Sequence, residues 1–280
     1  MAEVVARGLR FHVQRIAGAS SAPAPTVVFL HGLIMDNLSS WYFSAATQVS
    51  RVADVVLVDL RGHGKSERPT SGYGVDDHVA DLAAVLDELA VRGPVHLVGN
   101  SFGGLLALAF AIQHPERTAG VVLVDGHFGD DGFAEQMAAT LRLTGEERDR
   151  RIADSFKDWL GRHSHRKSTR LADGARALVE GTSLVADMAA TPALSRAELS
   201  TIRCPLLGIY GEHSDLRFRA ERTLTAIPHA EIMVFDGCTH SVLWEATEKV
   251  RRAIVFFVTA MAPAAAPARR HATAVGDARP

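Results

Sequence analysis

Short apolar runs, each bounded by polar or glycine-rich residues, dominate the hydrophobic pattern of the chain. Continuous runs of this kind are typical of strands that are buried on both faces of a sheet. They predict strands at residues 26–30, 54–59, 95–98, 120–125, 205–210 and 231–235. Apolar positions recur at helical spacing over residues 75–91, and a last helix is predicted over residues 241–261. Strands and helices that alternate in this way predict a parallel sheet with helices on both faces.

Two segments depart from this alternation. Residues 4–16 alternate loosely between apolar and polar positions, which predicts a hairpin at one edge of the sheet. Residues 126–195 contain no strand-like run and carry many charges, which indicates a helical insertion over the carboxyl ends of the strands. The resulting division is a first core segment at 1–126, a helical cap at 127–196, a second core segment at 197–262 and a disordered tail at 263–280.

The composition fits a globular chain, because 47% of the 280 residues are hydrophobic and 22% are charged. The net charge of −2 gives no field that favours nucleic acid or an anionic membrane as a partner. Cys204 and Cys238 are too few for a disulfide framework, so a reducing compartment fits. The first residues lack the pattern of a signal peptide, and no apolar run is long enough to span a membrane. We therefore expect a cytoplasmic monomer or homodimer.

The segment Gly99-Asn100-Ser101-Phe102-Gly103 lies between the predicted strand at 95–98 and an alanine- and leucine-rich segment. A strand, a tight G-x-S-x-G turn and a helix in succession form a nucleophile elbow, in which glycines avoid collisions around a strained serine. The serine hydroxyl then stands at a helix N-terminus, where free N–H groups favour negative charge. This context predicts Ser101 as a catalytic nucleophile.

A serine hydroxyl needs a base that accepts its proton and a carboxylate that orients the base. His240 follows the last predicted strand and precedes the last helix, so it is the predicted base. Asp215 follows the preceding strand, and the chain order serine, aspartate, histidine is typical of this architecture. Asp125, which also ends a strand, and Glu212 are alternative acids.

Attack on a carbonyl also requires donors for the oxyanion that forms. The predicted donors are the backbone N–H groups of Phe102, next to the nucleophile, and Leu33, in the loop after the first buried strand. Gly32 lets this loop approach the serine closely. His31 is interpreted as a structural hydrogen-bonding residue rather than as a second base.

Four ordered segments resemble the α/β-hydrolase superfamily: His31-Gly32, residues 59–66 (Asp-Leu-Arg-Gly-His-Gly-Lys-Ser), residues 99–104 (Gly-Asn-Ser-Phe-Gly-Gly) and residues 237–240 (Gly-Cys-Thr-His). They are spread over about residues 26–260, which is nearly the whole globular part of the chain. The resemblance implies an α/β fold with a mostly parallel eight-stranded sheet and a helical cap at 127–196. A serine at the elbow differs from the aspartate nucleophile of haloalkane dehalogenases and epoxide hydrolases of this fold.

The elbow is similar to that of hydrolases that cleave carbon–carbon bonds in aromatic-degradation products. Two features differ from that group. The loop at residues 33–41 lacks their glycine-rich oxyanion segment, and the acid motif has Ser214 inserted before Asp215 where Gly-x-x-Asp is commoner. The same loop resembles that of hydrolases of bacterial polyketide pathways.

Apolar residues near the predicted strand ends are candidates for an acyl pocket. Besides Leu33 and Phe102, they are Ile34, Met35, Trp41, Phe128, Leu243 and Trp244. The run His163-Ser164-His165 is interpreted as a solvated cap loop, because no further ligand set converges on it. The expected chemistry therefore requires no metal and no cofactor.

These observations predict a serine hydrolase of esters, thioesters or related activated carbonyls that acts on a small-molecule acyl substrate, free or linked to a carrier or CoA. An acyltransferase, a cyclase or a carbon–carbon bond hydrolase would use the same residues. A binding protein that keeps the hydrolase scaffold without catalysis is the alternative from another class.

Overall fold

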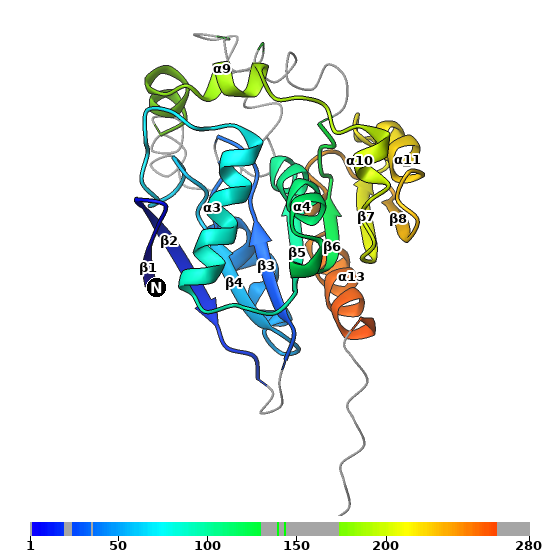
Figure 1. Ribbon diagram of the computed structural model, residues 1–280. Helices are drawn as coiled ribbons and strands as arrows, with labels where there is room; N and C mark the ends of the chain where they lie inside the picture. Colours follow the sequence, from blue (N-terminus) through cyan, green and yellow to red (C-terminus); the bar gives the residue numbers. More distant parts are fainter. Residues whose placement is uncertain are drawn as a thin grey trace, which may run out of the picture.

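An eight-stranded sheet runs through the centre of the protein (Figure 1). The computed structural model describes residues 2–19, 24–34, 36–129, 139, 143 and 174–261. The strands lie in the order β1-β2-β4-β3-β5-β6-β7-β8. Their bounds are Ala2–Ala6 (β1), Leu9–Ile16 (β2), Thr26–Leu30 (β3), Asp54–Val58 (β4), Val95–Asn100 (β5), Thr118–Val124 (β6), Leu206–Gly211 (β7) and Ala230–Phe235 (β8).

Strand direction follows the predicted pattern. β1 and β2 form the antiparallel hairpin at one edge, and β2 also pairs antiparallel with β4. All pairs from β4 to β8 are parallel. Parallel strands place all their carboxyl ends at one edge, so the loops that follow β3, β5, β6, β7 and β8 meet there. The prediction of a mostly parallel eight-stranded sheet is confirmed.

Helices cover both faces of this sheet (Figure 1). One face carries α3 (Val75–Glu88), α4 (Phe102–Gln113) and α11 (Arg217–Leu224). The other carries α1 (Ser39–Trp41), the π-helical segment η1 (Tyr42–Ala46), α2 (Thr47–Val49), α12 (Val242–Glu245) and α13 (Thr247–Ala260). Three further short helices are η2 (Pro115–Arg117), α9 (Leu184–Ala189) and α10 (Arg196–Leu199).

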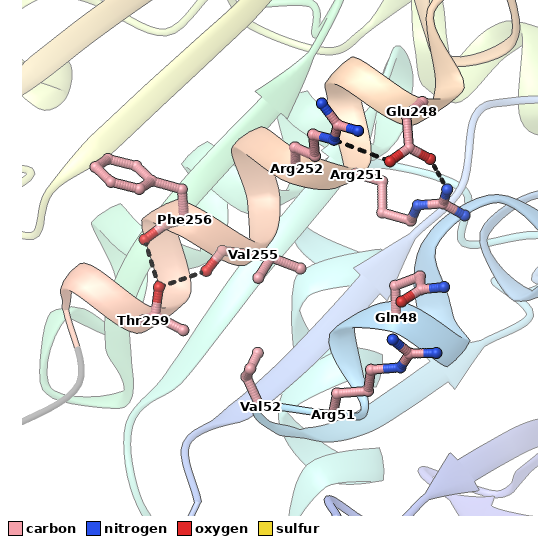
Figure 2. Close-up of a pocket in the computed structure, with 9 residues that line it drawn as sticks. All are labelled: Gln48, Arg51, Val52, Glu248, Arg251, Arg252, Val255, Phe256 and Thr259. Carbon is pink, nitrogen blue, oxygen red and sulfur yellow. Dashed lines mark hydrogen bonds and ion pairs between the residues drawn. The ribbon is translucent and has the colours of Figure 1, made fainter.

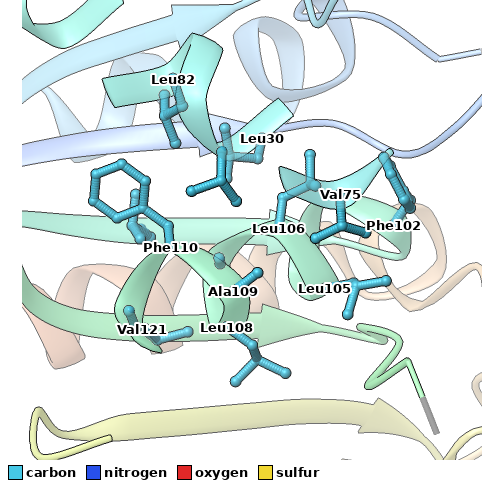
Figure 3. Close-up of a cluster of buried hydrophobic side chains, with 14 of the residues drawn as sticks. Leu30, Val75, Leu82, Phe102, Leu105, Leu106, Leu108, Ala109, Phe110 and Val121 are labelled. Atoms are coloured by element: carbon cyan, nitrogen blue, oxygen red, sulfur yellow. The ribbon is translucent and has the colours of Figure 1, made fainter. Parts of the chain in front are cut away.

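Alternate residues of the central strands β3 to β7 pack into two separate cores, which explains their continuous apolar runs. In β3, Val28 and Leu30 pack into the cluster beneath α3 and α4, whereas Val27 and Phe29 pack into the cluster beneath α13. Figure 3 shows how Leu106 and Phe110 of α4 lie against Leu30 and Val121 of the sheet. Burying a side chain of this size contributes about 1.5–3 kcal/mol. The core therefore holds α4, and with it the turn before α4, firmly against the strands.

The predicted last helix at 241–261 is divided in two. Ala246 leaves helical geometry, with φ −126° and ψ 38°, so α12 ends at Glu245 and α13 begins at Thr247. The Glu245 carboxylate turns back and accepts hydrogen bonds from the backbone N–H and the hydroxyl of Thr239, at 2.6 and 2.8 Å. This contact fixes the loop that carries His240.

Most of the predicted cap at 127–196 lies outside the described residues, as does the predicted tail at 263–280. The described part is helical at 174–181 and in α9. The Asp187 carboxylate of α9 accepts a hydrogen bond from the Tyr73 N–H at 2.7 Å. The Ser183 N–H donates to the Thr70 carbonyl at 2.9 Å. These bonds hold α9 against the loop that precedes α3.

Candidate active site

Ser101 occupies a strained turn between β5 and α4. Its φ of 51° and ψ of −118° lie outside the regions that L-residues usually adopt. A Cβ atom at Gly99 would collide with the Gly103 carbonyl, and one at Gly103 would collide with the Leu30 carbonyl. The turn therefore requires Gly99 and Gly103, the first and last residues of the G-x-S-x-G motif. This geometry is the predicted elbow, and such strain is typical of functional sites.

His240 contacts the serine from the loop between β8 and α12. Its Nε2 atom is 3.2 Å from the Ser101 hydroxyl oxygen. The two residues are 139 positions apart in the sequence, and the parallel sheet brings their loops together. A hydroxyl at this distance can donate its proton to a neutral imidazole.

The carboxylate that contacts His240 belongs to Asp125. Its Oδ1 atom is 3.0 Å from Nδ1 of the imidazole, and its side chain is 1% exposed. Asp125 follows β6 with a φ of 47°, and its N–H donates to the Ile209 carbonyl. The second carboxylate oxygen accepts the Gly211 N–H at 3.0 Å. This arrangement allows the aspartate to orient the ring and to stabilise its charged form.

The structure differs from the prediction that Asp215 orients His240. Asp215 is exposed, and the residue that turns inward from the loop after β7 is Ser214, whose hydroxyl donates to Asp125 at 2.5 Å. The inserted serine moves the aspartate one position further along the loop and out of the site. Glu212, the other alternative, accepts a hydrogen bond from the Gly237 N–H instead. Among the predicted acids, the geometry thus selects Asp125.

Neighbouring charges set the proton affinity of His240. Burial lowers the pKa of this imidazole, but the hydrogen bond and the charge of Asp125 raise it, with further contributions from the carboxylates of Asp215 and Glu245. The net effect raises the pKa above its ordinary value of 6.5. The ring therefore binds a proton more readily than a free imidazole does, as a base must when it accepts the proton of a hydroxyl.

Two backbone N–H groups, those of Phe102 and Leu33, were predicted to bind the oxyanion. Phe102 is the first residue of α4, so its N–H has no acceptor within the helix. A Cβ atom at Gly32 would lie 3.5 Å from Cβ of Ser101, which shows how closely the loop after β3 approaches the nucleophile. Within the described residues, the N–H of Leu33 in this loop makes no hydrogen bond. Their role as oxyanion donors stays a prediction.

Two buried histidines hold this loop through reciprocal hydrogen bonds. Nε2 of His31 accepts the Leu60 N–H at 3.0 Å, and Nε2 of His63 accepts the Ile34 N–H at 2.9 Å. Each ring uses Nδ1 to donate to a nearby backbone carbonyl. Burial, with the proximity of His31, lowers the pKa of His63 to about 3, so the ring stays neutral and can accept. The role of His63 was not predicted from the sequence.

His127 is a second residue that sequence reasoning missed. Its backbone N–H donates to the Ser101 carbonyl at 3.1 Å, which supports the elbow, and its ring centre is 5.9 Å from that of His240. Burial and the proximity of His240 lower the pKa of His127 to about 3. A neutral second imidazole therefore lies beside the base. Its position two residues after a strand-end aspartate was the only available signal.

The residues predicted to line an acyl pocket have different surroundings. Ile34 is half-buried beside Leu33, and Phe128 is buried and stacked on Tyr210. Trp41 is fully buried against Phe29, with its indole N–H donating to the Leu30 carbonyl, so it is part of the core. Leu243 and Trp244 pack into the same core, beneath α13, and Met35 lies outside the described residues. Their contact with substrate stays a prediction.

A cavity of about 490 Å³ lies apart from these groups, between α2 and α13 (Figure 2). It is lined by Gln48, Arg51, Val52, Glu248, Arg251, Arg252, Val255, Phe256 and Thr259.

Among the described residues, no group of three or more histidine, cysteine, aspartate or glutamate side chains could hold a metal ion. The same part of the chain contains no helix long and apolar enough to cross a membrane.

Comparisons with known proteins agree on one fold. A family model described as alpha/beta hydrolase fold matches residues 25–247. The chain is 31% identical over 222 residues to a 2-hydroxy-6-oxononadienedioate/2-hydroxy-6-oxononatrienedioate hydrolase of Burkholderia vietnamiensis, which covers 73% of this chain and 76% of that protein. The hydrolase of the same name from Cupriavidus pinatubonensis is 30% identical, with 85% and 88% covered.

Solved structures of hydrolases superpose on nearly the whole chain. An enol-lactonase from Burkholderia xenovorans aligns with a TM-score of 0.72 and 23% identity, covering 92% of this chain and 100% of that one. A thermophilic esterase from Thermogutta terrifontis gives a TM-score of 0.75 and 21% identity, with 93% and 98% covered. At this identity the likeness concerns the fold.

Proposed function

Because this chain belongs to the alpha/beta hydrolase fold family, we propose that it is a serine hydrolase that cleaves an ester, a thioester or a related activated carbonyl. The observation that carries the proposal is the continuous chain of contacts from the Ser101 hydroxyl through His240 to the Asp125 carboxylate. Three groups in this order form the arrangement that makes a serine hydroxyl nucleophilic.

The first half of the reaction forms an acyl-enzyme. Ser101 attacks the substrate carbonyl while Nε2 of His240 accepts the hydroxyl proton, and Asp125 stabilises the imidazolium that results. The N–H groups of Phe102 and Leu33 bind the oxyanion of the tetrahedral intermediate. His240 then donates its proton to the leaving group, which departs as an alcohol or a thiol.

The second half releases the acid. Water attacks the acyl carbonyl of the ester on Ser101, and His240 accepts a proton from this water. The same oxyanion donors stabilise the second tetrahedral intermediate, and the proton on His240 returns to the serine oxygen as it leaves. Each step uses groups of the chain itself, so the proposed reaction needs no cofactor.

A fluorophosphonate probe tests the nucleophile, because it reacts covalently with an activated serine. We expect label on Ser101 in the wild-type protein, found by mass spectrometry of its peptides, and none in the Ser101→Ala variant. A short p-nitrophenyl ester should give a burst of nitrophenol with the wild type alone. Label on any other serine would refute the proposed nucleophile.

Carbon–carbon bond hydrolysis is the second candidate, favoured by the two curated relatives and by the Gly-Asn-Ser elbow. Those relatives are named for hydrolysis of 2-hydroxy-6-oxononadienedioate and 2-hydroxy-6-oxononatrienedioate. The conjugated double bonds of such a compound absorb light, and this absorbance falls when the carbon chain is cut. The test is to follow this absorbance with a 2-hydroxy-6-oxo-dienoate as substrate. A higher kcat/KM for its loss than for p-nitrophenyl esters would select carbon–carbon bond hydrolysis. Product analysis with an added alcohol or amine distinguishes hydrolysis from acyl transfer.

A further inference from the structure

The loop that joins β7 to α11 contacts the candidate acid through the side chain of Ser214. Ser214 is 4% exposed, and its hydroxyl donates to Oδ1 of Asp125 at 2.5 Å. The same hydroxyl oxygen accepts the N–H of Leu216 at 3.1 Å. This second bond occupies the oxygen as an acceptor and directs its proton to the carboxylate.

Asp125 therefore has three donors around it. Ser214 and His240 both bind Oδ1, at 2.5 and 3.0 Å, and the Gly211 N–H binds Oδ2 at 3.0 Å. The bond to Oδ2 comes from the backbone and defines one end of the carboxylate. Ser214 supplies the only side-chain hydroxyl that a described residue offers to Oδ1, so it determines how the carboxylate is rotated toward the ring.

The same loop also holds the loop of His240. The Glu212 N–H donates to the Phe235 carbonyl at 3.0 Å, and the His213 N–H donates to the Cys238 carbonyl at 2.8 Å. A Cβ atom at Gly211 would collide with the Thr239 carbonyl, so the two loops are in direct contact. Ser214 is thus fixed relative to both the acid and the base.

We propose that Ser214 is a positioning residue for the Asp125 carboxylate. The inference rests on the proposed serine-hydrolase function. Its geometric basis is that Oγ of Ser214 and Nδ1 of His240 contact the same carboxylate oxygen. A carboxylate carried by residue 214 would occupy the space beside the imidazole once the Asp125 side chain is removed.

The first experiment compares Ser214→Ala with Ser214→Thr, which keeps the hydroxyl. The loss of a hydrogen bond to a charged group corresponds to roughly a 10- to 100-fold change in the rate. We expect Ser214→Ala to slow fluorophosphonate labelling of Ser101 by this factor and Ser214→Thr to label at nearly the wild-type rate. The acidic limb of the labelling rate against pH should move to lower pH in Ser214→Ala, because a rotated Asp125 no longer raises the pKa of His240.

The second experiment compares Asp125→Ala with the double variant Asp125→Ala/Ser214→Asp. Removing the group that orients the imidazole lowers the rate by roughly 10³- to 10⁴-fold in serine enzymes. We expect the double variant to label at least about tenfold faster than Asp125→Ala, because the new carboxylate orients the ring. If Ser214→Ala does not fold, this comparison still tests whether the side chain of residue 214 reaches the space beside the imidazole.

The outcomes separate the two proposals. If the wild-type protein is not labelled at Ser101, the proposed function fails. If it is labelled but Ser214→Ala has the wild-type rate and pH limb, the positioning role of Ser214 is wrong. A double variant no faster than Asp125→Ala would show that the side chain of residue 214 is not aimed at the space beside the imidazole, which would also contradict the positioning role.

Discussion

Asp125 and Ser101 follow directly after two residues that are register partners on adjacent strands. Asn100 of β5 pairs with Val124 of β6, and the Ser101 N–H donates to the Val124 carbonyl at 3.2 Å. The nucleophile and the carboxylate thus leave neighbouring strands at the same level. His240 contacts both side chains from the loop after β8. The sheet register therefore fixes two of the three groups before any loop conformation is considered.

This relationship predicts unequal effects of removing the two aspartates that sequence reasoning considered. Asp125→Asn keeps the shape but replaces an acceptor by an amide that can donate to Nδ1, which favours the wrong imidazole tautomer. We expect acylation of Ser101 to slow by roughly 10³- to 10⁴-fold. Asp215→Asn, at an exposed position, should change the rate less than about threefold. Burst kinetics with a p-nitrophenyl ester measure both.

The two variants serve as each other's controls, because both remove one negative charge near His240. Thermal unfolding should show that each variant is folded. A large loss in Asp215→Asn with a small loss in Asp125→Asn would reverse the assignment of the acid.

The pH dependence of the reaction should report the proton affinity of His240. The imidazole must be neutral to accept the serine proton, so activity is lost as pH falls through its pKa. Because that pKa is raised above 6.5, we expect the acidic limb of kcat/KM above pH 6.5. In Asp215→Asn the limb should move slightly to lower pH, since the Asp215 charge contributes to the rise. A wild-type limb well below pH 6 would contradict this electrostatic account.

The His63 ring should matter for the rate although it does not contact Ser101. In His63→Leu the Ile34 N–H loses its acceptor, which leaves the loop with Leu33 less firmly held. An unsatisfied buried donor costs about 1–3 kcal/mol of unfolding free energy. Loss of one oxyanion donor lowers the rate by about 10²- to 10³-fold, so we expect a decrease up to that size. Burst kinetics and urea unfolding measure the two effects.

A matched control for His63→Leu is Lys65→Ala, since Lys65 is an exposed residue of the loop that carries His63. It should leave both the rate and the unfolding free energy nearly unchanged. His63→Gln offers an amide oxygen as an acceptor and should recover part of the loss. Unchanged acylation in His63→Leu would mean that this hydrogen bond does not hold the oxyanion loop.

The strands and the elbow were predictable because their sequence patterns follow from simple packing. β3 matches the predicted strand at 26–30 residue for residue, since side chains on both its faces are buried. The elbow requires glycines at two positions, and both are visible in the sequence. The choice between Asp125 and Asp215 depends on which side chain turns inward from its loop. That choice depends on the positive φ of Asp125 and on one inserted residue, neither of which a strand pattern encodes.

Two histidines near the site, His63 and His127, were beyond sequence reasoning, whereas His240 was predicted. Nε2 of His63 accepts the backbone N–H of Ile34, and the backbone N–H of His127 donates to the Ser101 carbonyl. Such contacts depend on the distance between loops rather than on residue type. Among thirteen histidines in the chain, the position of His127 two residues after a strand-end aspartate was the only signal that pointed to either of them.

The buried histidines should make the protein sensitive to acid. His96 of β5 is 2% exposed, its ring packs edge-on against Phe257 and, among the described residues, Nδ1 has no hydrogen-bond partner. Burial lowers its pKa from 6.5 to about 4. In the unfolded chain, His96 therefore binds a proton below about pH 6.5. In the folded protein it binds this proton only below about pH 4. Over this range, each unit decrease in pH lowers the unfolding free energy by about 1.4 kcal/mol.

Replacing His96 by leucine removes this group while keeping an apolar contact with Phe257. We expect the unfolding free energy of His96→Leu, measured with urea at pH 7, 6 and 5, to fall less steeply than that of the wild type. The stability contributed by neutral His96 is complete above pH 6.5, so the two proteins should differ most at pH 5. The exposed His229 provides a control, since His229→Asn should keep the wild-type pH dependence. Parallel curves for His96→Leu and the wild type would show that His96 takes up its proton without unfolding, because the fold then accommodates the charge.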